Sequence, residues 1–243
     1  MMPRTSDFTA TLLRTFAVQG SWNYRTMIGG GIAYALLPLL QRIHAGDPVA
    51  LREAIERHSS AFNAHPYLSP LAIGAFARVE HDGRDPETIE RFRAALRGPL
   101  GALGDQAVWA GWRPFCTLSA VVAFCMGLDA RVAALAFVLV YNAAHVGLRV
   151  WGLRMGWTHG LDVGPILKGS PLKAIGAGLV PINAALIGAV VVLLSLRTPG
   201  FGPSPVLGGA IAVVSLGAFF LPARAGTLAI LTLFASVGVW LLS

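Results

Sequence analysis

Residues 98–114 (GPLGALGDQAVWAGWRP) constrain the fold of this chain more than any other segment. The segment is apolar enough for a bilayer, yet Gly98, Gly101 and Gly104 interrupt it and it carries Asp105 and Arg113. Irregular backbone is tolerated at membrane depth only where protein covers it or where it lines a water-filled cavity. Charges at that depth are costly and usually mark pathways or binding sites. We therefore predict a broken or re-entrant helix, an element typical of transporters.

The composition is that of an integral membrane protein. Apolar residues make up 55% of the chain and charged residues 13%, whereas about 25% charged residues is usual in soluble domains. The net charge of +7 is explained by basic loops on the inner side of a membrane, and nucleic acid is not an expected partner. We predict an all-α integral membrane protein: a helical bundle with broken or re-entrant helices in the N-terminal half and transmembrane spans in the C-terminal half.

The acidic residues divide the chain into two unlike parts, because 10 of the 12 precede residue 114. We predict an amphipathic and re-entrant part over residues 1–114 and a transmembrane part over residues 115–243, within one structural unit. A bilayer crossing needs about 20 apolar residues. Residues 115–128 and 132–148 are short for a crossing and are predicted to form either a hairpin or two tilted spans. Residues 174–196 are long enough for a full span, and residues 205–242 are predicted to form a final hairpin.

Two surface helices are predicted in the first part, each starting at an Asp-Pro pair, because Asp is a good N-cap and Pro suits the first turn. The first runs from Asp47 to about Ser60 and places His58 on a solvated face. The second begins at Asp85 and is predicted to stop at Gly98-Pro99.

Polar side chains within apolar segments are the candidate binding groups. Asp105, Trp109 and Arg113 recur at i, i+4 and i+8, so a helix capped by Asp105 and ended by Pro114 would align them along one stripe. This stripe is either a ledge that grips a sugar or a structural cap with a cation–π pair between Arg113 and Trp109.

Amide and indole groups, which suit neutral polyols, occur in two further segments. They are Gln19, Trp22 and Asn23 in QGSWNYR, and Asn63 and His65 in FNAHPYLSP. For each segment, an ordinary capped loop is the alternative interpretation.

A second polar stripe, Asn142, His145 and Arg149, falls at i, i+3 and i+7 on an otherwise apolar helix. We predict that it forms a seam between helices or subunits. An interhelical hydrogen bond is the ordinary role for His145, and a proton relay is the alternative.

Motifs for bond chemistry are missing from the sequence. It has no Walker-type loop, no HExxH and no nucleophile elbow, and Cys116 and Cys125 lack metal-ligand spacing. We predict no catalytic residue, no metal site and no cofactor. An intramembrane enzyme is disfavoured because it would need a carboxylate pair or a metal-spaced cluster.

Four segments together resemble the IID component of the mannose/fructose/sorbose-type sugar phosphotransferase system (PTS), in the order found in that family. They are FAVQGSWNYRTM (16–27), AIERHSSAFNAHPYLSP (54–70), GPLGALGDQAVWAGWRP (98–114) and YNAAHVGLRVWGLRMGWTHG (141–160).

The resemblance implies a multi-pass subunit of the bacterial cytoplasmic membrane, embedded in lipid, that is not an enzyme alone. With a IIC subunit it would form a hetero-oligomer and the path for a mannose-, fructose- or sorbose-like sugar. Cytoplasmic IIA and IIB partners would phosphorylate the sugar on entry. The residues expected to line or brace the path are Gln19, Trp22, Asn23, Asn63, His65, Asp105, Trp109 and Arg113.

The family usually has a longer polar insertion where this chain has RTPGFGPSP (197–205). This difference motivates the alternative function, a non-transporting membrane scaffold or regulatory subunit of such a system.

Overall fold

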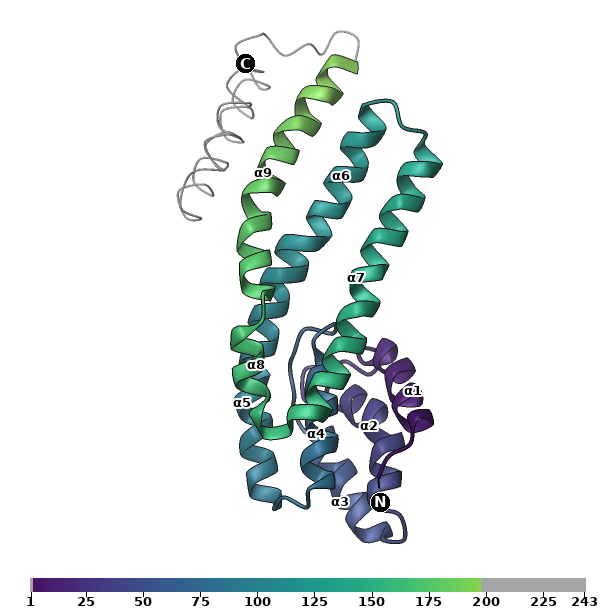
Figure 1. Cartoon of the computed structure of the whole chain (residues 1–243), viewed down its shortest axis with the longest axis vertical. Helices are drawn as coiled ribbons and strands as arrows, with labels where there is room; N and C mark the ends of the chain where they lie inside the picture. Colours follow the sequence, from purple (N-terminus) through teal and green to yellow (C-terminus); the bar gives the residue numbers. More distant parts are fainter. Residues whose placement is uncertain (1, 198–243) are drawn as a thin grey trace. The chain divides into compact units, whose positions relative to one another are not determined.

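The computed structural model describes residues 2–197, so the predicted hairpin over 205–242 and the shortened 197–205 loop lie, except for Arg197, outside the described residues. Within the described range the chain is helical and has two isolated β-bridges but no strand (Figure 1). The all-α prediction is confirmed. The chain separates into two compact units: residues 1–105 with 143–170, and residues 106–142 with the chain from 171 onward.

The first unit contains five complete helices, the second part of a sixth and a short seventh. They are α1 (Thr5–Arg14), α2 (Gly29–Ile43), α3 (Pro48–Ser59), α4 (Ser69–His81), α5 (Pro86–Gly104), α7 (Ala130–His159) from residue 143, and α8 (Val163–Gly169). Short 3-10 turns follow α1 and α7 at η1 (Thr15–Ala17) and η3 (Gly160–Asp162).

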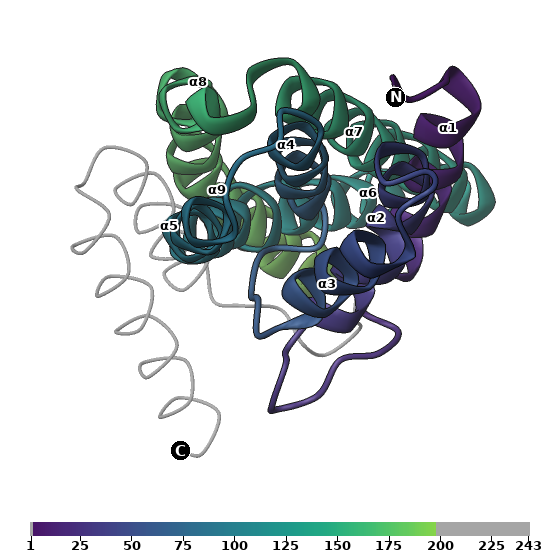
Figure 2. The ribbon, with the colours of Figure 1, turned by 90° about the horizontal axis from the view of Figure 1, so that it is seen from below.

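Helix α2 forms the centre of this unit, where α1, α3 and α4 pack against it (Figure 2). Its apolar residues Ile32, Leu36 and Leu39 are fully buried, and their spacing of four and three places them on one face. Gly31 permits a close approach, because a Cβ there would collide with the backbone of Val18.

The two Asp-Pro helix starts are confirmed. Asp47 accepts a hydrogen bond from Ala50 N at 2.9 Å, and Asp85 accepts one from Thr88 N at 2.8 Å. The predicted stop at Gly98-Pro99 is wrong, because α5 continues to Gly104. Pro99 removes the hydrogen bond to the carbonyl of Ala95, but both residues lie on the exposed face, so this loss is not buried.

Paired glycines let α4 and α7 cross in contact. A Cβ on Gly74 of α4 would meet the Leu153 carbonyl oxygen of α7, and a Cβ on Gly156 of α7 would meet the Leu71 carbonyl oxygen of α4. The crossing is also held by Arg78, whose Nη1 donates to the Trp157 carbonyl at 3.3 Å. The two backbones therefore touch with no room for side chains between them.

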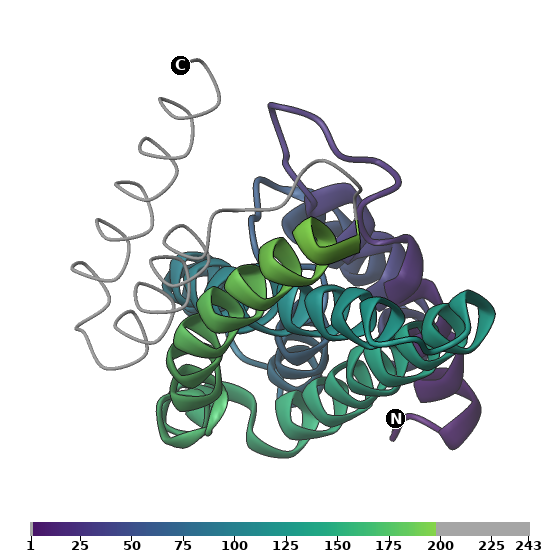
Figure 3. The ribbon, with the colours of Figure 1, turned by 90° about the horizontal axis from the view of Figure 1, so that it is seen from above.

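The second unit contains the π-helical segment η2 (Asp105–Trp112) from residue 106, α6 (Arg113–Cys125), the first part of α7, and α9 (Leu172–Arg197). Helices α6 and α9 pack against each other (Figure 3). The Nδ2 of Asn183 in α9 donates to the carbonyls of Ala110 at 3.1 Å and Gly111 at 2.9 Å. These bonds satisfy carbonyls in η2, where the regular α-helical ladder is interrupted.

The irregularity predicted for residues 98–114 is a π-helical segment, and the helix does not break there. Helix is continuous from Pro86 to Cys125. Pro114 does not end this helix. It has no N–H to donate to the carbonyl of Ala110, and that carbonyl accepts from Asn183 Nδ2 instead.

Two helical stretches in the described chain, Pro86–Cys125 and Ala130–Leu194, are long and apolar enough to cross a membrane by length and composition. Only 22% and 17% of their most apolar windows are buried within the protein. A soluble core helix would bury most of this apolar surface, so lipid or a membrane partner is the expected surrounding.

Candidate functional site

A pocket of ≈ 530 Å³ lies within the first unit. It lies between the loop before α2, the segment after α3 and the last turns of α5. We call it the polar pocket. It is lined by Arg25, Met27, Ala61, Phe62, Asn63, Arg97, Gly98, Gly101, Ala102 and Asp105.

Four side chains give the polar pocket its chemistry: Arg25, Asn63, Arg97 and Asp105. All four are exposed. Within the described part of the chain, none of these side chains takes part in a hydrogen bond or an ion pair. Two guanidinium groups, a carboxylate and an amide thus line the polar pocket, and their hydrogen-bond donors and acceptors are available to a ligand.

The glycines that interrupt residues 98–114 have two different roles. A Cβ on Gly98 or Gly101 would meet nothing within 4 Å, so the absence of side chains there leaves the pocket open. A Cβ on Gly104 would collide with the His65 side chain. The first two glycines therefore shape the pocket, and the third permits close packing behind it.

The backbone of one pocket wall is strained. Met27 has a φ of 55°, a left-handed conformation that costs a non-glycine residue roughly 1–2 kcal/mol. Two hydrogen bonds join this wall to the wall that contains Phe62. Ile28 N donates to Phe62 O at 3.0 Å, and Phe62 N donates to Thr26 O at 3.2 Å. Strain of this kind persists where the surroundings hold it, and it concentrates at ligand sites.

The structure places the predicted site residues in different surroundings. Asn63 and Asp105 line the polar pocket. Gln19 is exposed, and the Trp22 ring, 47% exposed, packs edge-on against Tyr24. The Asn23 amide bonds within its own loop: Oδ1 accepts from the backbone N of Arg25 and of Thr26. Asn23 thus shapes the loop that carries Arg25.

His65 lies behind the pocket and not in its lining. It is 2% exposed, and its Nδ1 accepts from the backbone N of Tyr67 at 3.2 Å. Burial, followed by the nearby charges of Arg149 and His145, lowers the pKa of His65 to about 4. His65 is therefore neutral at pH 7 and is placed to brace the pocket.

The predicted cap at Asp105 is corrected by the structure. Asp105 is not an N-cap, because it has helical φ and ψ of −61° and −44° inside a continuous helix. It belongs to the first unit, whereas Trp109 and Arg113 belong to the second. Trp109 is 42% exposed and Arg113 is also exposed.

The predicted seam of Asn142, His145 and Arg149 on α7 contacts other elements of this chain. Arg149 donates from Nε to His145 Nε2 at 2.8 Å, and its Nη1 donates to the carbonyl of Thr15. The His145 ring stacks on Tyr67 with centroids 3.8 Å apart. Asn142 bonds within its own helix, donating to Val138 O at 2.8 Å.

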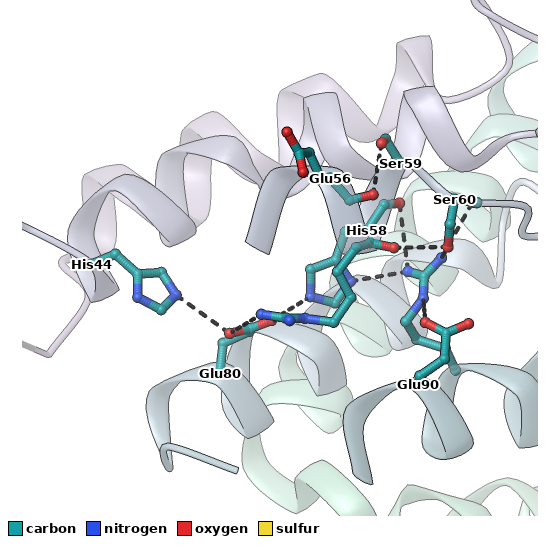
Figure 4. A network of polar contacts seen from close by, with 9 residues as sticks. His44, Glu56, His58, Ser59, Ser60, Glu80 and Glu90 are labelled. Carbon is teal, nitrogen blue, oxygen red and sulfur yellow. Dashed lines mark hydrogen bonds and ion pairs between the residues drawn. The ribbon is translucent and has the colours of Figure 1, made fainter. Parts of the chain in front are cut away.

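Sequence reasoning missed a buried ionic cluster formed by α3, α4 and α5 (Figure 4). His58 is fully buried, so its predicted place on the solvated face of α3 is wrong. The exposed face of α3 carries Arg52 and Glu56. Ala54 and His58, four residues apart, lie together on the buried face. The spacing of four residues between Ala54 and His58 is the sequence signal that could have placed His58 on the buried face.

Glu80 is the anion at the centre of this cluster. Its carboxylate accepts from Arg57 Nε at 3.1 Å and from His58 Nε2 at 2.9 Å, and it lies 3.3 Å from His44 Nε2. Burial alone would raise the pKa of Glu80, but the hydrogen bond from His58 and the hydrogen bonds and positive charge of Arg57 lower it to about 2.

Arg93 fixes the protonation of His58. Its Nη1 lies 3.0 Å from His58 Nδ1, and because a guanidinium can only donate, that nitrogen must accept. His58 is therefore neutral, with its proton on Nε2. Burial, the largest cause, lowers the pKa of His58 to about 4.

The cluster also holds one wall of the polar pocket. Arg93 donates from Nη2 to the Ser60 carbonyl at 3.2 Å and to Ser60 Oγ at 2.9 Å. Ser60 directly precedes the wall residues Ala61–Asn63, and Arg93 lies one helical turn before Arg97. The buried charges thus fix the spacing between two sides of the pocket.

Acid is expected to destabilise the protein through His58. Its pKa of about 4 when folded lies below the ordinary 6.5, so its contribution is present above pH 6.5 and is lost as the pH falls toward 4. Linkage gives a loss of about 2 kcal/mol between pH 7.5 and pH 5. Thermal unfolding in detergent measures the loss of stability in acid, to which His65 also contributes through its lowered pKa, and His58→Gln should reduce the dependence by the share of His58. An equal acid slope in wild type and variant would contradict the assignment.

A family model described as PTS system mannose/fructose/sorbose family IID component matches residues 4–199. The mannose-specific EIID component of Escherichia coli K12 is 28% identical over 192 residues, which cover 76% of this chain and 67% of that protein. The fructose permease IID component of Bacillus subtilis is 26% identical over 74% of this chain and 66% of that protein. The chain thus spans about two thirds of the length of these relatives.

Two solved structures share the fold. A chain in the cryoEM structure of the mannose transporter ManYZ with microcin E492 has a TM-score of 0.61 at 21% identity, covering 98% of this chain and 96% of that chain. A second structure, described as a membrane protein, has a TM-score of 0.70 at 22% identity with the same coverage. The family match extends over more than half of the sequence and confirms the resemblance. The chain belongs to the mannose/fructose/sorbose family of PTS IID components.

Proposed function

We propose that this chain forms, with a IIC subunit, the path of a mannose-, fructose- or sorbose-like sugar through the bacterial cytoplasmic membrane. The assembly is a hetero-oligomer, and this chain is its multi-pass, non-catalytic member. Cytoplasmic IIA and IIB partners transfer phosphate to the sugar as it enters. The names of the relatives and the fold shared with a chain of the ManYZ complex support this proposal.

One observation carries the proposal. Three segments of the resemblance, 16–27, 54–70 and 98–114, are far apart in sequence but contribute residues to one pocket. That pocket presents an amide and a carboxylate, Asn63 and Asp105, and both group types bond sugar hydroxyls. Its volume is within the range of about 300–1,000 Å³ typical of small-molecule sites.

Reconstitution tests this role. Vesicles that contain this chain and its IIC partner, with the IIA and IIB proteins and phosphoenolpyruvate on the cytoplasmic side, should accumulate sugar phosphate on that side. Vesicles that lack this chain should accumulate none. If the complete set forms a complex but yields no product with mannose, fructose or sorbose, the transport role is wrong, and a scaffold or regulatory subunit is the remaining function.

A further inference from the structure

We propose that the polar pocket is a phosphate-binding site, in which Arg25 and Arg97 hold the phosphate of a phosphorylated sugar. This inference rests on the proposed function for the identity of the sugar, and on the pocket itself for the phosphate. The side chains that line the pocket carry two positive charges and one negative charge. A neutral sugar alone would not need two guanidinium groups.

The availability of the two arginines supports an anionic ligand. Three other arginines of the first unit are paired with carboxylates: Arg57 with Glu80, Arg78 with Asp82, and Arg91 with Glu87. Arg25 and Arg97 have no such partner within the described residues. Guanidinium groups bind phosphate oxygens with paired, charge-assisted hydrogen bonds.

The remaining lining suits the sugar part of such a ligand. Asp105 accepts hydrogen bonds from hydroxyls but repels phosphate, so it favours an orientation with the phosphate toward the arginines. Asn63 supplies both a donor and an acceptor. Gly98 and Gly101 leave the helix surface bare, which allows a ring to lie close to the backbone of α5.

Phosphate could come from a soluble sugar phosphate or from a lipid headgroup, because the chain is a membrane protein. Equilibrium binding to the purified full-length chain in lipid-free detergent separates the two sources. The probes are mannose 6-phosphate, mannose, and a short-chain phosphatidic acid below its micellar concentration. We expect mannose 6-phosphate to bind at least tenfold more tightly than mannose.

Matched variants test the assignment. Arg25→Gln and Arg97→Gln should each weaken mannose 6-phosphate binding at least tenfold. Arg91→Gln, on the same helix but paired with Glu87 outside the pocket, should leave binding unchanged. Asp105→Asn should retain or strengthen phosphate binding, because it removes a repelling charge.

The outcomes distinguish this proposal from the proposed function, because the binding measurement uses no partner protein. Binding that depends on both arginines supports the site even if the reconstituted vesicles yield no product. Arginine-dependent binding of phosphatidic acid alone supports a phosphate site whose source is lipid. The proposal would be overturned if neither mannose 6-phosphate nor phosphatidic acid bound. It would also be overturned if binding survived both arginine substitutions.

Discussion

Replacing Glu80 with Gln is expected to lower the free energy of unfolding by about 3–5 kcal/mol, the usual cost of removing one partner from a buried ion pair. The Glu80 side chain is 4% exposed and its carboxylate contacts Arg57, His58 and His44. Glutamine keeps the shape but not the charge, so the partly buried guanidinium of Arg57, whose side chain is 15% exposed, is left without its anion.

Glu56→Gln is the matched control. Glu56 also pairs with an arginine, Arg52, but their side chains are 65% and 82% exposed. An exposed pair at i, i+4 contributes less than about 1 kcal/mol. Chemical unfolding in detergent, followed by circular dichroism, compares the two variants. Equal losses of stability in both would show that the cluster is not held by its buried charge.

Gly156→Ala is expected to destabilise the first unit by about 3 kcal/mol, the upper part of the usual range for overpacking. The added methyl group would collide with the backbone at Leu71 and Ala75 of α4. Backbone cannot rotate away as a flexible side chain can, so α4 and α7 must separate. Gly74→Ala, on the other helix of the crossing, should have a similar effect because its methyl group would meet Leu153 and Trp157.

A glycine-to-alanine substitution elsewhere on α7 should not lower the stability of the protein. A Cβ on Gly147 would meet nothing within 4 Å, and alanine is favoured over glycine in a helix by about 1 kcal/mol. Gly147→Ala should therefore be neutral or stabilising when thermal unfolding in detergent is measured for this variant beside Gly156→Ala and Gly74→Ala. If Gly156→Ala were equally harmless, the close crossing of α4 and α7 would be incorrect.

Local signals predicted much of the helical structure. Asp47 and Asp85 start helices because a capping carboxylate and a following proline act within four residues. Composition alone indicated the membrane class. These features depend on neighbours in the sequence, which are visible without the fold.

The predicted stop at Gly98-Pro99 is wrong because the Ala95 carbonyl that Pro99 leaves without a donor lies on the exposed face, where water can bond it. Further along the same helix, the irregular carbonyls of η2 are satisfied from a distant part of the chain. Asn183, more than seventy residues from Ala110 and Gly111, donates to their carbonyls. Glycine and proline in the sequence therefore marked an unusual helix correctly, but they did not show that it continues.

The candidate site was only partly predictable for the same reason. Asn63 and Asp105 were singled out as polar residues in apolar or irregular segments, whereas nothing in the sequence singled out Arg25 and Arg97 before the fold placed them around one pocket. The role of Glu80 depends on His58 and Arg93, which lie on neighbouring helices. No spacing rule connects residues that meet only through tertiary packing.

The formation of sugar phosphate by reconstituted vesicles, measured for Gly101→Leu beside wild type, tests most directly whether the polar pocket serves transport. Leucine at position 101 fills the pocket without meeting other protein atoms at its Cβ, so the variant should insert and bind its IIC partner. Gly164→Leu, which also enters open space but lies outside the pocket, is the control. We expect at least a tenfold loss of product for Gly101→Leu and wild-type product for Gly164→Leu. Wild-type product from both variants would contradict the assignment of the pocket to the sugar path.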